Sequence, residues 1–283
     1  MARGRARSGR PSRPWQAELP ELPEVEATRR RLQRSLAGRR VIAVAVRDDP
    51  IVIAGLAPRV LAAALRGRRV RAARRRGKHL WLELDRRPWP AFHFGMTGRF
   101  SFYRDEADRP RFWKLELIMD GGRRVAYADA RRFGRIRLQQ DPAREPPIAL
   151  LGFDPLEGLP SAPDLAAHLA RRKAPLKAVL LDQSLFAGVG NWVADEVLYQ
   201  ARLSPHREAR SLSPAEVRRL RRSLQSVIAR AVSVNADSDR FPTTWLFHTR
   251  WGRRAGALTA RDEAIVHETI GGRTTAWVPS RQS

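Results

Sequence analysis

The chain has 283 residues, with 54 lysines and arginines against 29 aspartates and glutamates, so its formal net charge is +25. A chain of this length with 43% hydrophobic residues can fill one large domain or two ordinary ones. The absence of cysteine excludes disulfides and thiolate metal sites. No apolar run approaches the roughly 18 residues that span a bilayer, so we expect no membrane segment.

The positive charge is spread over the whole chain and favours a polyanionic partner, because basic side chains that neutralise phosphates release counterions. Arginine far outnumbers lysine, so a GC-rich genome that encodes arginine at solvated positions is the alternative explanation. Residues 1–19 are rich in arginine and lack the apolar core of a secretory signal. A DNA-binding arm, a transit-like peptide and a misassigned start codon all remain open for this segment.

The first predicted element is a helix over residues 21–36. Val25, Leu32 and Leu36 fall roughly on one face, and Glu21 and Glu24 complement the helix dipole at its start. Residues 40–140 then show short β-like runs between glycine, proline and charged turns, which predict an antiparallel sandwich. These runs are VIAVAV, HLWLEL, AFHFGM, WKLELIM, RVAYAD and RIRL.

Helical spacing replaces the β pattern after Pro155. The segments PDLAAHLARR and PLKAVLLDQ predict helices, and Ser213 opens a long helix to about Val232 with Pro214 in its first turn. Residues 245–282 return to β-like segments and predict a terminal hairpin near Gly271. Proline is concentrated in residues 141–160, where we place the domain boundary. The fold class predicted is therefore α+β.

Six motifs occur in a fixed order along the chain. They are PELPEVE (20–26), RRRGKHLWLEL (74–84), FGMTG (94–98), DARRFGRI (129–136), LLDQSLFAGVGNWVADEVLYQARLSP (180–205) and GGRTTAWVPSRQ (271–282). Taken alone, the first is an ordinary acidic helix start. The ordered set resembles the formamidopyrimidine-DNA glycosylase family from Pro20 to the end of the chain. NADSDRFPTTWLFH and GGRTTAWVP are most similar to the plant and fungal branch, in which a metal-free hairpin replaces a zinc finger.

The resemblance implies the identity of each part of the chain. Residues 1–19 would be a basic extension, disordered or not translated, and residues 20–145 a catalytic β-sandwich domain that begins with a helix. Residues 155–235 would form a helix–two-turns–helix DNA-binding domain, and residues 236–283 a zinc-less finger hairpin.

The segment LFAGVGN ahead of an apolar helix predicts a helix N-terminus capped by Asn191, where backbone N–H groups and the dipole favour an anion. Gly188 and Gly190 permit a close approach of the backbone. The resemblance implies that Asn191 contacts a DNA phosphate.

The resemblance assigns three basic residues to the DNA backbone. It implies that Lys78 contacts phosphate and assists strand cleavage, and that Arg273 grips the phosphates that flank the lesion. Lys173 would be a further phosphate contact. Taken alone, each of these side chains is more typical of a solvated charge.

Met96, Arg131 and Phe133 are the chemical types needed to fill the vacancy that an extruded nucleotide leaves. Met96 and Phe133 would be apolar wedges in the vacancy, and Arg131 would donate a hydrogen bond to the base that has lost its partner. Core packing is the alternative for Met96 and Phe133, but with the resemblance we expect them to intercalate.

The mechanism of the family uses the secondary amine of an N-terminal proline, here Pro20. This amine attacks C1′ of the damaged nucleotide, the base leaves, and a Schiff base forms before elimination cuts the strand. An α-amino group titrates near pH ~8, so much of it is neutral at physiological pH. Glu21 would be the general acid/base at the sugar, and Glu24 would orient the site and cap the helix.

The sequence departs from this pattern because nineteen residues precede Pro20, and the amide nitrogen of an internal proline has no available lone pair. Translation could begin at codon 19, with Leu19 replaced by an initiator Met that is then removed. The extension could instead be cleaved after synthesis. The third alternative is a DNA-binding relative that has lost the lyase chemistry.

The function expected is a bifunctional glycosylase and abasic-site lyase that removes oxidised purines, namely formamidopyrimidines, further-oxidised guanine and, as a weaker substrate, 8-oxoguanine. The alternatives are an endonuclease VIII-like glycosylase for oxidised pyrimidines and a non-catalytic binder of damaged DNA. We expect double-stranded DNA with damaged bases or abasic sites as partner, a monomer, and neither cofactor nor metal. The expected location is the cytoplasm, with the nucleoid, in a bacterium, or the nucleus in a eukaryote.

Overall fold

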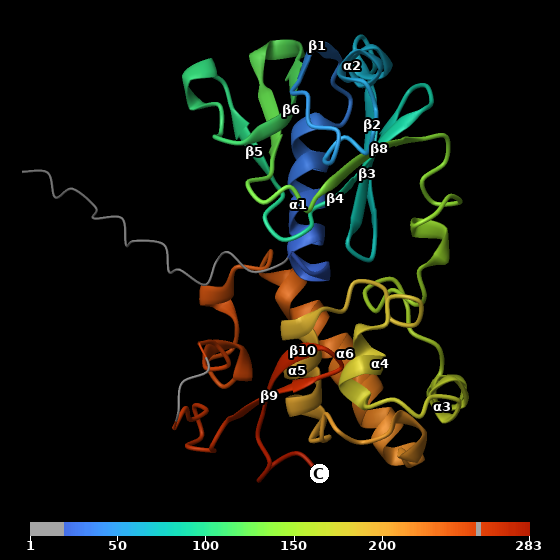
Figure 1. The fold of residues 1–283 in the computed structure, drawn as a ribbon, viewed down its shortest axis with the longest axis vertical. Helices are drawn as coiled ribbons and strands as arrows, with labels where there is room; N and C mark the ends of the chain where they lie inside the picture. The colour runs from blue at the N-terminus through green and yellow to red at the C-terminus, as the bar shows by residue number, and fades with distance from the viewer. Residues whose placement is uncertain (1–19, 253–255) are drawn as a thin grey trace, which may run out of the picture.

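The computed structural model describes residues 20–252 and 256–283, so the predictions for residues 1–19 lie outside the described residues. The described chain forms a β-rich lobe and a helical lobe, with helix α1 (Leu22–Leu36) reaching from one to the other (Figure 1). The segment that follows the last strand of the β-rich lobe runs down one side of the molecule to the helical lobe (Figure 1). The α+β fold class is confirmed.

Two antiparallel sheets make up the β-rich lobe, and their strand orders are β1-β6-β7-β5 and β2-β3-β4-β8. Their apolar faces share one core with α1 and with the short helix α2 (Pro58–Leu65). The strands are β1 (Val41–Val46), β2 (Val70–Arg76), β3 (His79–Leu84), β4 (Trp89–His93), β5 (Arg99–Tyr103), β6 (Trp113–Met119), β7 (Arg124–Ala128) and β8 (Arg135–Gln139).

Helix α1 belongs to both cores. Val25, Leu32 and Leu36 are fully buried in the core of the β-rich lobe, whereas Leu22, in the first turn, packs into the core of the helical lobe. The backbone N–H of Leu22 also donates to the carbonyl of Gly188, 3.1 Å away. The start of α1 is therefore fixed against both lobes at once.

Within the described residues, the α-helices of the other lobe are α3 (Ala162–Ala170), α4 (Leu176–Leu181), α5 (Asn191–Ala201) and α6 (Pro214–Ser233). Helix α6 begins after Ser213 with Pro214 at its first position, as the sequence predicted, and Ser213 and Glu216 also form a capping box there. Nearly all of α5 is buried, which agrees with its weak amphipathic pattern.

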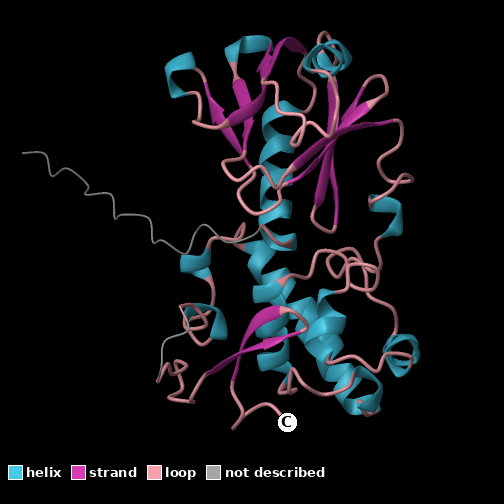
Figure 2. Cartoon of the chain, in the orientation of Figure 1, coloured by secondary structure: helices cyan, strands magenta, loops and turns pink. Residues whose placement is uncertain are grey.

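The terminal hairpin consists of β9 (Val266–Ile270) and β10 (Arg273–Trp277), and it lies against the helical lobe (Figure 2). Ala276 and Val278 share a small core with Tyr199 of α5 and with Leu246 and Ile265. This core packs the open end of the hairpin against the C-terminal part of α5. At the other end of the hairpin, Arg273 begins β10 next to Thr274, whose carbonyl accepts a hydrogen bond from Asn191 at the start of α5.

The sequence patterns missed α2, β2 and β5. Strand β2 reads VRAARRR and is not among the β-like runs predicted above; Ala73 and Arg75 are buried in it, whereas Arg71 and Arg74 are exposed. None of the described helices is long and apolar enough to cross a membrane. The domain boundaries predicted above stay predictions.

Candidate active site

A cavity of about 260 Å³ lies where the two lobes meet. Its walls come from the start of α1, the β2–β3 turn, the start of α5 and the hairpin. The lining residues are Pro20, Glu21, Lys78, His79, His93, Gly95, Leu151, Leu181, Gln183, Gly190, Asn191 and Arg273. Residues from five of the six sequence motifs are thus brought to one place.

Glu21 is buried, and its carboxylate accepts hydrogen bonds from the backbone N–H groups of Trp192 at 2.9 Å and Val193 at 3.1 Å. These are N–H groups of the first turn of α5, which have no partner within the helix. The glutamate of one lobe therefore caps a helix of the other. The helix dipole also favours a negative charge at this position.

The prediction that Asn191 caps α5 is wrong. Gly190 is the N-cap residue and Asn191 is the first residue of the helix. The Asn191 amide instead donates to the carbonyl of Thr274 in β10, 2.9 Å away, because Glu21 already satisfies the first-turn N–H groups. Gly190 leaves room for that carboxylate, since an added Cβ would lie 2.2 Å from the carboxyl carbon of Glu21.

Burial raises the pKa of Glu21, and the positive charge of Lys78 partly opposes this effect. Burial has the opposite effect on the basic Lys78, whose pKa it lowers. The Lys78 ammonium donates to the carbonyl of Val189 at 3.0 Å. Glu24 accepts from the backbone N–H of Glu21 at 3.0 Å, and burial together with the charge of Glu21 raises the pKa of Glu24 to about 8. A carboxyl and an amine, both shifted toward their neutral forms, thus face one cavity.

A buried ion pair holds the turn that carries Lys78. Arg75 donates to Asp154 and to the carbonyl of Gly77, and the N–H of Gly77 donates to Asp154 at 2.8 Å. Gly77 has a φ of +55°, and an added Cβ there would lie 3.1 Å from the backbone nitrogen of Gly188. The β2–β3 turn therefore packs directly on the loop that leads into α5.

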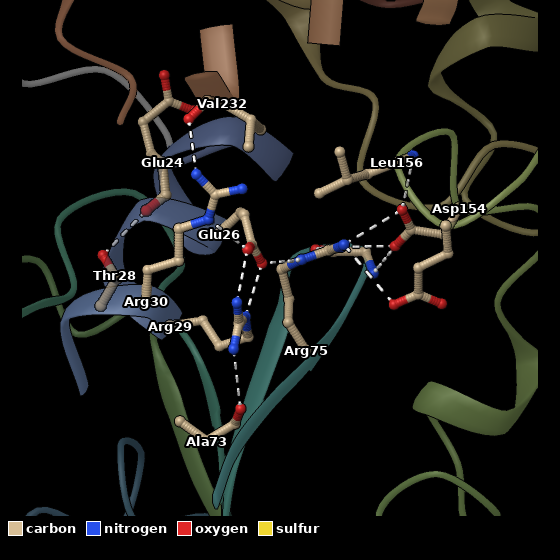
Figure 3. A network of polar contacts seen from close by, with 12 residues as sticks. Glu24, Glu26, Thr28, Arg29, Arg30, Ala73, Arg75, Asp154, Leu156 and Val232 are labelled. Atoms are coloured by element: carbon tan, nitrogen blue, oxygen red, sulfur yellow. Dashed lines mark hydrogen bonds and ion pairs between the residues drawn. The ribbon is translucent and has the colours of Figure 1, made fainter. Parts of the chain in front are cut away.

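The same ion pair extends into a network that joins the two lobes (Figure 3). Glu26 of α1 accepts from Arg75 at 3.2 Å and also pairs with Arg29 and Arg30. Arg30 in turn donates to the carbonyl of Val232 in α6, 3.1 Å away. Charged hydrogen bonds thereby connect strand β2, helix α1, helix α6 and the segment around Asp154.

A second buried network, which the sequence did not reveal, fastens the hairpin to α5. Asp195 of α5 accepts from Lys177, from Arg250 at 2.7 Å and from the backbone N–H of Ala276 in β10 at 3.1 Å. Lys177 also donates to the carbonyl of Asn191, 2.9 Å away. These partners lie far apart in the sequence, so no local pattern could have indicated the cluster.

The three residues expected to intercalate lie in two neighbouring loops beside the cavity. The loop of Met96 and the loop of Arg131 and Phe133 are tied together by the buried Asp129, which accepts from the side chain of Thr97 and the N–H of Arg131. Phe133 is 49% exposed, with the Arg131 guanidinium 5.1 Å from the centre of its ring. The core-packing alternative is therefore excluded for Phe133, whereas Met96 is half-buried.

Lys173 is exposed between α3 and α4 and is not among the residues that line the cavity. His79 and His93 do line it, with ring centres 4.8 Å apart, although the sequence gave no reason to choose them. Burial lowers the pKa of His79 to about 3 and that of His93 to about 4, so both imidazoles are neutral near pH 7.

No group of three or more metal-ligating side chains occurs within residues 20–252 and 256–283. The site that the structure defines there consists of a carboxylate, an amine, a guanidinium and a helix N-terminus around one cavity.

Comparison with known protein families agrees with this arrangement. The formamidopyrimidine-DNA glycosylase N-terminal domain matches residues 19–136, and the helix–two-turns–helix domain of the same family matches residues 151–243. The chain therefore belongs to the formamidopyrimidine-DNA glycosylase family.

Individual relatives cover most of the chain. A formamidopyrimidine-DNA glycosylase of Arabidopsis thaliana is 40% identical over an alignment of 277 residues, and the match covers 93% of this chain and 71% of the plant protein. One from Paracoccus denitrificans is 41% identical over an alignment of 230 residues, and the match covers 78% of this chain and 81% of the relative. The plant relative agrees with the resemblance of the terminal segments to the plant and fungal branch.

Solved structures of the family have the same fold. The Lactococcus lactis enzyme bound to DNA containing an abasic site is 25% identical, with a TM-score of 0.82, and the match covers 93% of this chain and 99% of that one. The Thermus thermophilus protein is 37% identical, with a TM-score of 0.77, and the match covers 93% and 98% of the two chains.

Proposed function

We propose that this protein is a base-excision-repair glycosylase and abasic-site lyase that acts on oxidised purines in double-stranded DNA, with Pro20 as its amine once this residue is N-terminal. The observation that carries the proposal is the meeting of Pro20, Glu21, Lys78 and Arg273 around one cavity between the lobes. Relatives with this fold have been solved with DNA that contains an abasic site or a formamidopyrimidine lesion.

The proposed reaction begins with attack of the Pro20 nitrogen on C1′ of the damaged nucleotide, which breaks the glycosidic bond. Glu21 lies next to this nitrogen in sequence and is buried, so it can hold a proton for transfer at the sugar. The C1′–O4′ bond then breaks, O4′ takes a proton, and the nitrogen and C1′ form a Schiff base. The Schiff base acidifies C2′, and elimination then breaks the C–O bonds on both sides of the sugar.

Basic and polar groups around the cavity would hold the phosphates of the damaged strand. Arg273 and Asn191 line the cavity, and Lys78 contributes an ammonium to it. Met96, Arg131 and Phe133 would enter the duplex and replace the extruded nucleotide. An exposed phenylalanine is suited to stacking between bases, because every base has an apolar face.

The proposed substrate class rests on the resemblance of residues 235–248 and 271–279 to the plant and fungal branch of the family. It rests also on the Arabidopsis thaliana relative, which is named a formamidopyrimidine-DNA glycosylase. We propose formamidopyrimidines and further-oxidised guanine as the main substrates and 8-oxoguanine as a weaker one. The endonuclease VIII-like alternative predicts oxidised pyrimidines instead.

A single-turnover excision assay tests the proposal. Protein that begins at Pro20 is mixed in excess with duplexes that carry a formamidopyrimidine, 8-oxoguanine or an oxidised pyrimidine, and release of each base is followed. The proposal predicts fastest release of the formamidopyrimidine and loss of release in Glu21→Gln. Faster release of the oxidised pyrimidine would support the alternative, and DNA binding without release of any base would indicate a non-catalytic binder.

A further inference from the structure

The chain offers unusually few amines. It contains only four lysines, at positions 78, 114, 173 and 177. Arginine, which supplies the rest of the positive charge, stays protonated at every accessible pH and does not act as an amine nucleophile. In the sequence as printed, the Pro20 nitrogen is also unavailable, because it forms the peptide bond with Leu19.

Among the residues that the structure describes, Lys78 is the one lysine that lines the cavity. Lys177 is fully buried in its pair with Asp195, and Lys114 pairs with Asp49 at 2.7 Å on the β-rich lobe. Lys173 is exposed on the connection between α3 and α4. The geometry thus presents a single side-chain amine to the place where the sugar would lie.

The surroundings of Lys78 favour the neutral amine. Burial lowers the pKa of Lys78, and the positive charge of Arg273 lowers it further, while Glu21 and Glu24 oppose both effects. A buried lysine with a lowered pKa is the type of amine that enzymes use to form Schiff bases with carbonyl groups. Glu21 lines the same cavity and can exchange the protons that such a reaction needs.

We propose that Lys78 is a second Schiff-base amine, which gives this chain abasic-site lyase activity even when residues precede Pro20. The substrate is the ring-opened sugar of an abasic site, whose C1′ is an aldehyde. The inference rests on the proposed function, because it needs abasic DNA to be bound in this cavity.

The proposed reaction needs no reactant other than the abasic DNA and water. The lone pair of the Lys78 nitrogen forms the C–N bond to C1′, the carbonyl oxygen takes a proton, and the carbinolamine loses water to give the imine. Loss of a proton from C2′ then expels the 3′ phosphate as the C3′–O bond breaks. Water finally hydrolyses the imine and restores the amine.

The test uses the full chain, residues 1–283, with duplex DNA that contains an abasic site and with borohydride, which reduces the imine to a stable adduct. The adduct is digested and its site is found by mass spectrometry. We expect it on Lys78. An adduct on Met1, on Lys173 or on another amine would overturn the proposal, as would the absence of any adduct while DNA binding is retained.

Matched lysine-to-arginine variants provide the control. Lys78→Arg keeps the charge but removes the nucleophile, so the trapped fraction should fall at least about tenfold while DNA affinity changes little. Lys114→Arg keeps the pairing with Asp49, and the fraction of this variant that is cross-linked to the DNA by borohydride should equal that of the wild type. Equal trapping by Lys78→Arg and the wild type would contradict the inference.

The pH dependence separates Lys78 from an ordinary exposed lysine. Because the pKa of Lys78 is lowered from its usual value of 10.5, the initial trapping rate should rise with pH and level off below that value. The excision assay with protein that begins at Pro20 is independent of this result. If protein that begins at Pro20 releases no base, the proposed function is wrong. If the full chain forms no borohydride adduct at Lys78, only the proposed role of Lys78 is wrong.

Discussion

Gly190 is the residue on which the position of Glu21 depends most directly. Its backbone φ is −126°, which any residue can adopt, so its requirement for glycine is one of space. An added Cβ would fall within 2.6 Å of three atoms of the Glu21 side chain. The carboxylate would have to leave the first-turn N–H groups of α5 to make room.

We predict that Gly190→Ala slows base excision by about 100-fold, because a displacement of about 1 Å at a reacting group can have an effect of that size. Gly158→Ala is the matched control, since an added Cβ there meets nothing within 4 Å. Single-turnover excision rates of the two variants give the comparison. Equal rates for Gly190→Ala and the wild type would show that the Glu21 position does not matter.

Glu24 has two separable effects on stability. Glu24→Ala removes the acceptor for the N–H of Glu21 and should lower the free energy of unfolding by about 1 kcal/mol. Glu24→Gln keeps an acceptor but does not titrate. Since the pKa of Glu24 is about 8 in the folded protein and 4.5 ordinarily, the unfolded chain releases its proton first as the pH rises.

The wild type should therefore lose stability relative to Glu24→Gln between pH 4.5 and about 8. Urea unfolding of both proteins across this range measures the difference. A constant difference over the whole range would mean that Glu24 is ionised in the folded protein at all these pH values.

Asp195 joins two elements, the helix α5 on which it lies and the terminal hairpin. Arg250 donates twice to one carboxylate oxygen of Asp195, and the same oxygen accepts from the backbone of Ala276. Lys177, on α4, binds the other oxygen. The hairpin that carries Arg273 is thus held by a buried charge cluster.

We predict that Arg250→Met lowers the free energy of unfolding by about 3 kcal/mol, the cost of leaving a buried charge short of a partner. Affinity for abasic-site DNA should fall with it, because Arg273 is then held less firmly. Arg250→Lys should restore part of both. Denaturant unfolding and hydrogen exchange of residues 266–277 provide the measurements, and unchanged exchange in Arg250→Met would contradict the role of the cluster.

At the scale of the whole molecule, the lobes are joined by the network around Arg75. Its side chain is 2% exposed and pairs with Asp154, also 2% exposed, while Glu26 links the pair to α1. The neighbouring Arg74 lies on the opposite face of β2, is 58% exposed and pairs with Glu83.

These adjacent arginines make a matched pair of substitutions. Arg75→Met should lower the free energy of unfolding by about 3–5 kcal/mol, since it leaves Asp154 buried without its charge partner. Arg74→Met should cost less than about 1 kcal/mol, as is usual for an exposed ion pair. Urea unfolding of both variants tests the difference, and equal costs would contradict the network's part in joining the lobes.

The sequence predicted the elements that local patterns define and missed those that depend on remote partners. The helix start at Ser213 and the β-like run of residues 79–84 are local, and both appear in the fold. The burial of Arg75 could not be predicted, because its partner Asp154 lies 79 positions away in the sequence. The cap of α5 was misassigned to Asn191 for the same reason, since the capping carboxylate comes from Glu21 in the other lobe.

Most candidate site residues came from ordered motifs, and the structure brings six of them to one cavity: Pro20, Glu21, Lys78, Gly190, Asn191 and Arg273. His79, His93, Asp129 and Asp195 were missed, because histidine and aspartate singly placed in strands, turns or helices give no distinctive pattern.

The most direct test of the central claim is borohydride trapping of protein that begins at Pro20 on abasic-site DNA, with the adduct located by peptide mapping. We predict that the main adduct is on the Pro20 nitrogen, and that no adduct forms at Pro20 in protein that keeps residues 1–19, because this nitrogen is then an amide. Tight binding of the same DNA with no adduct on Pro20 would contradict it.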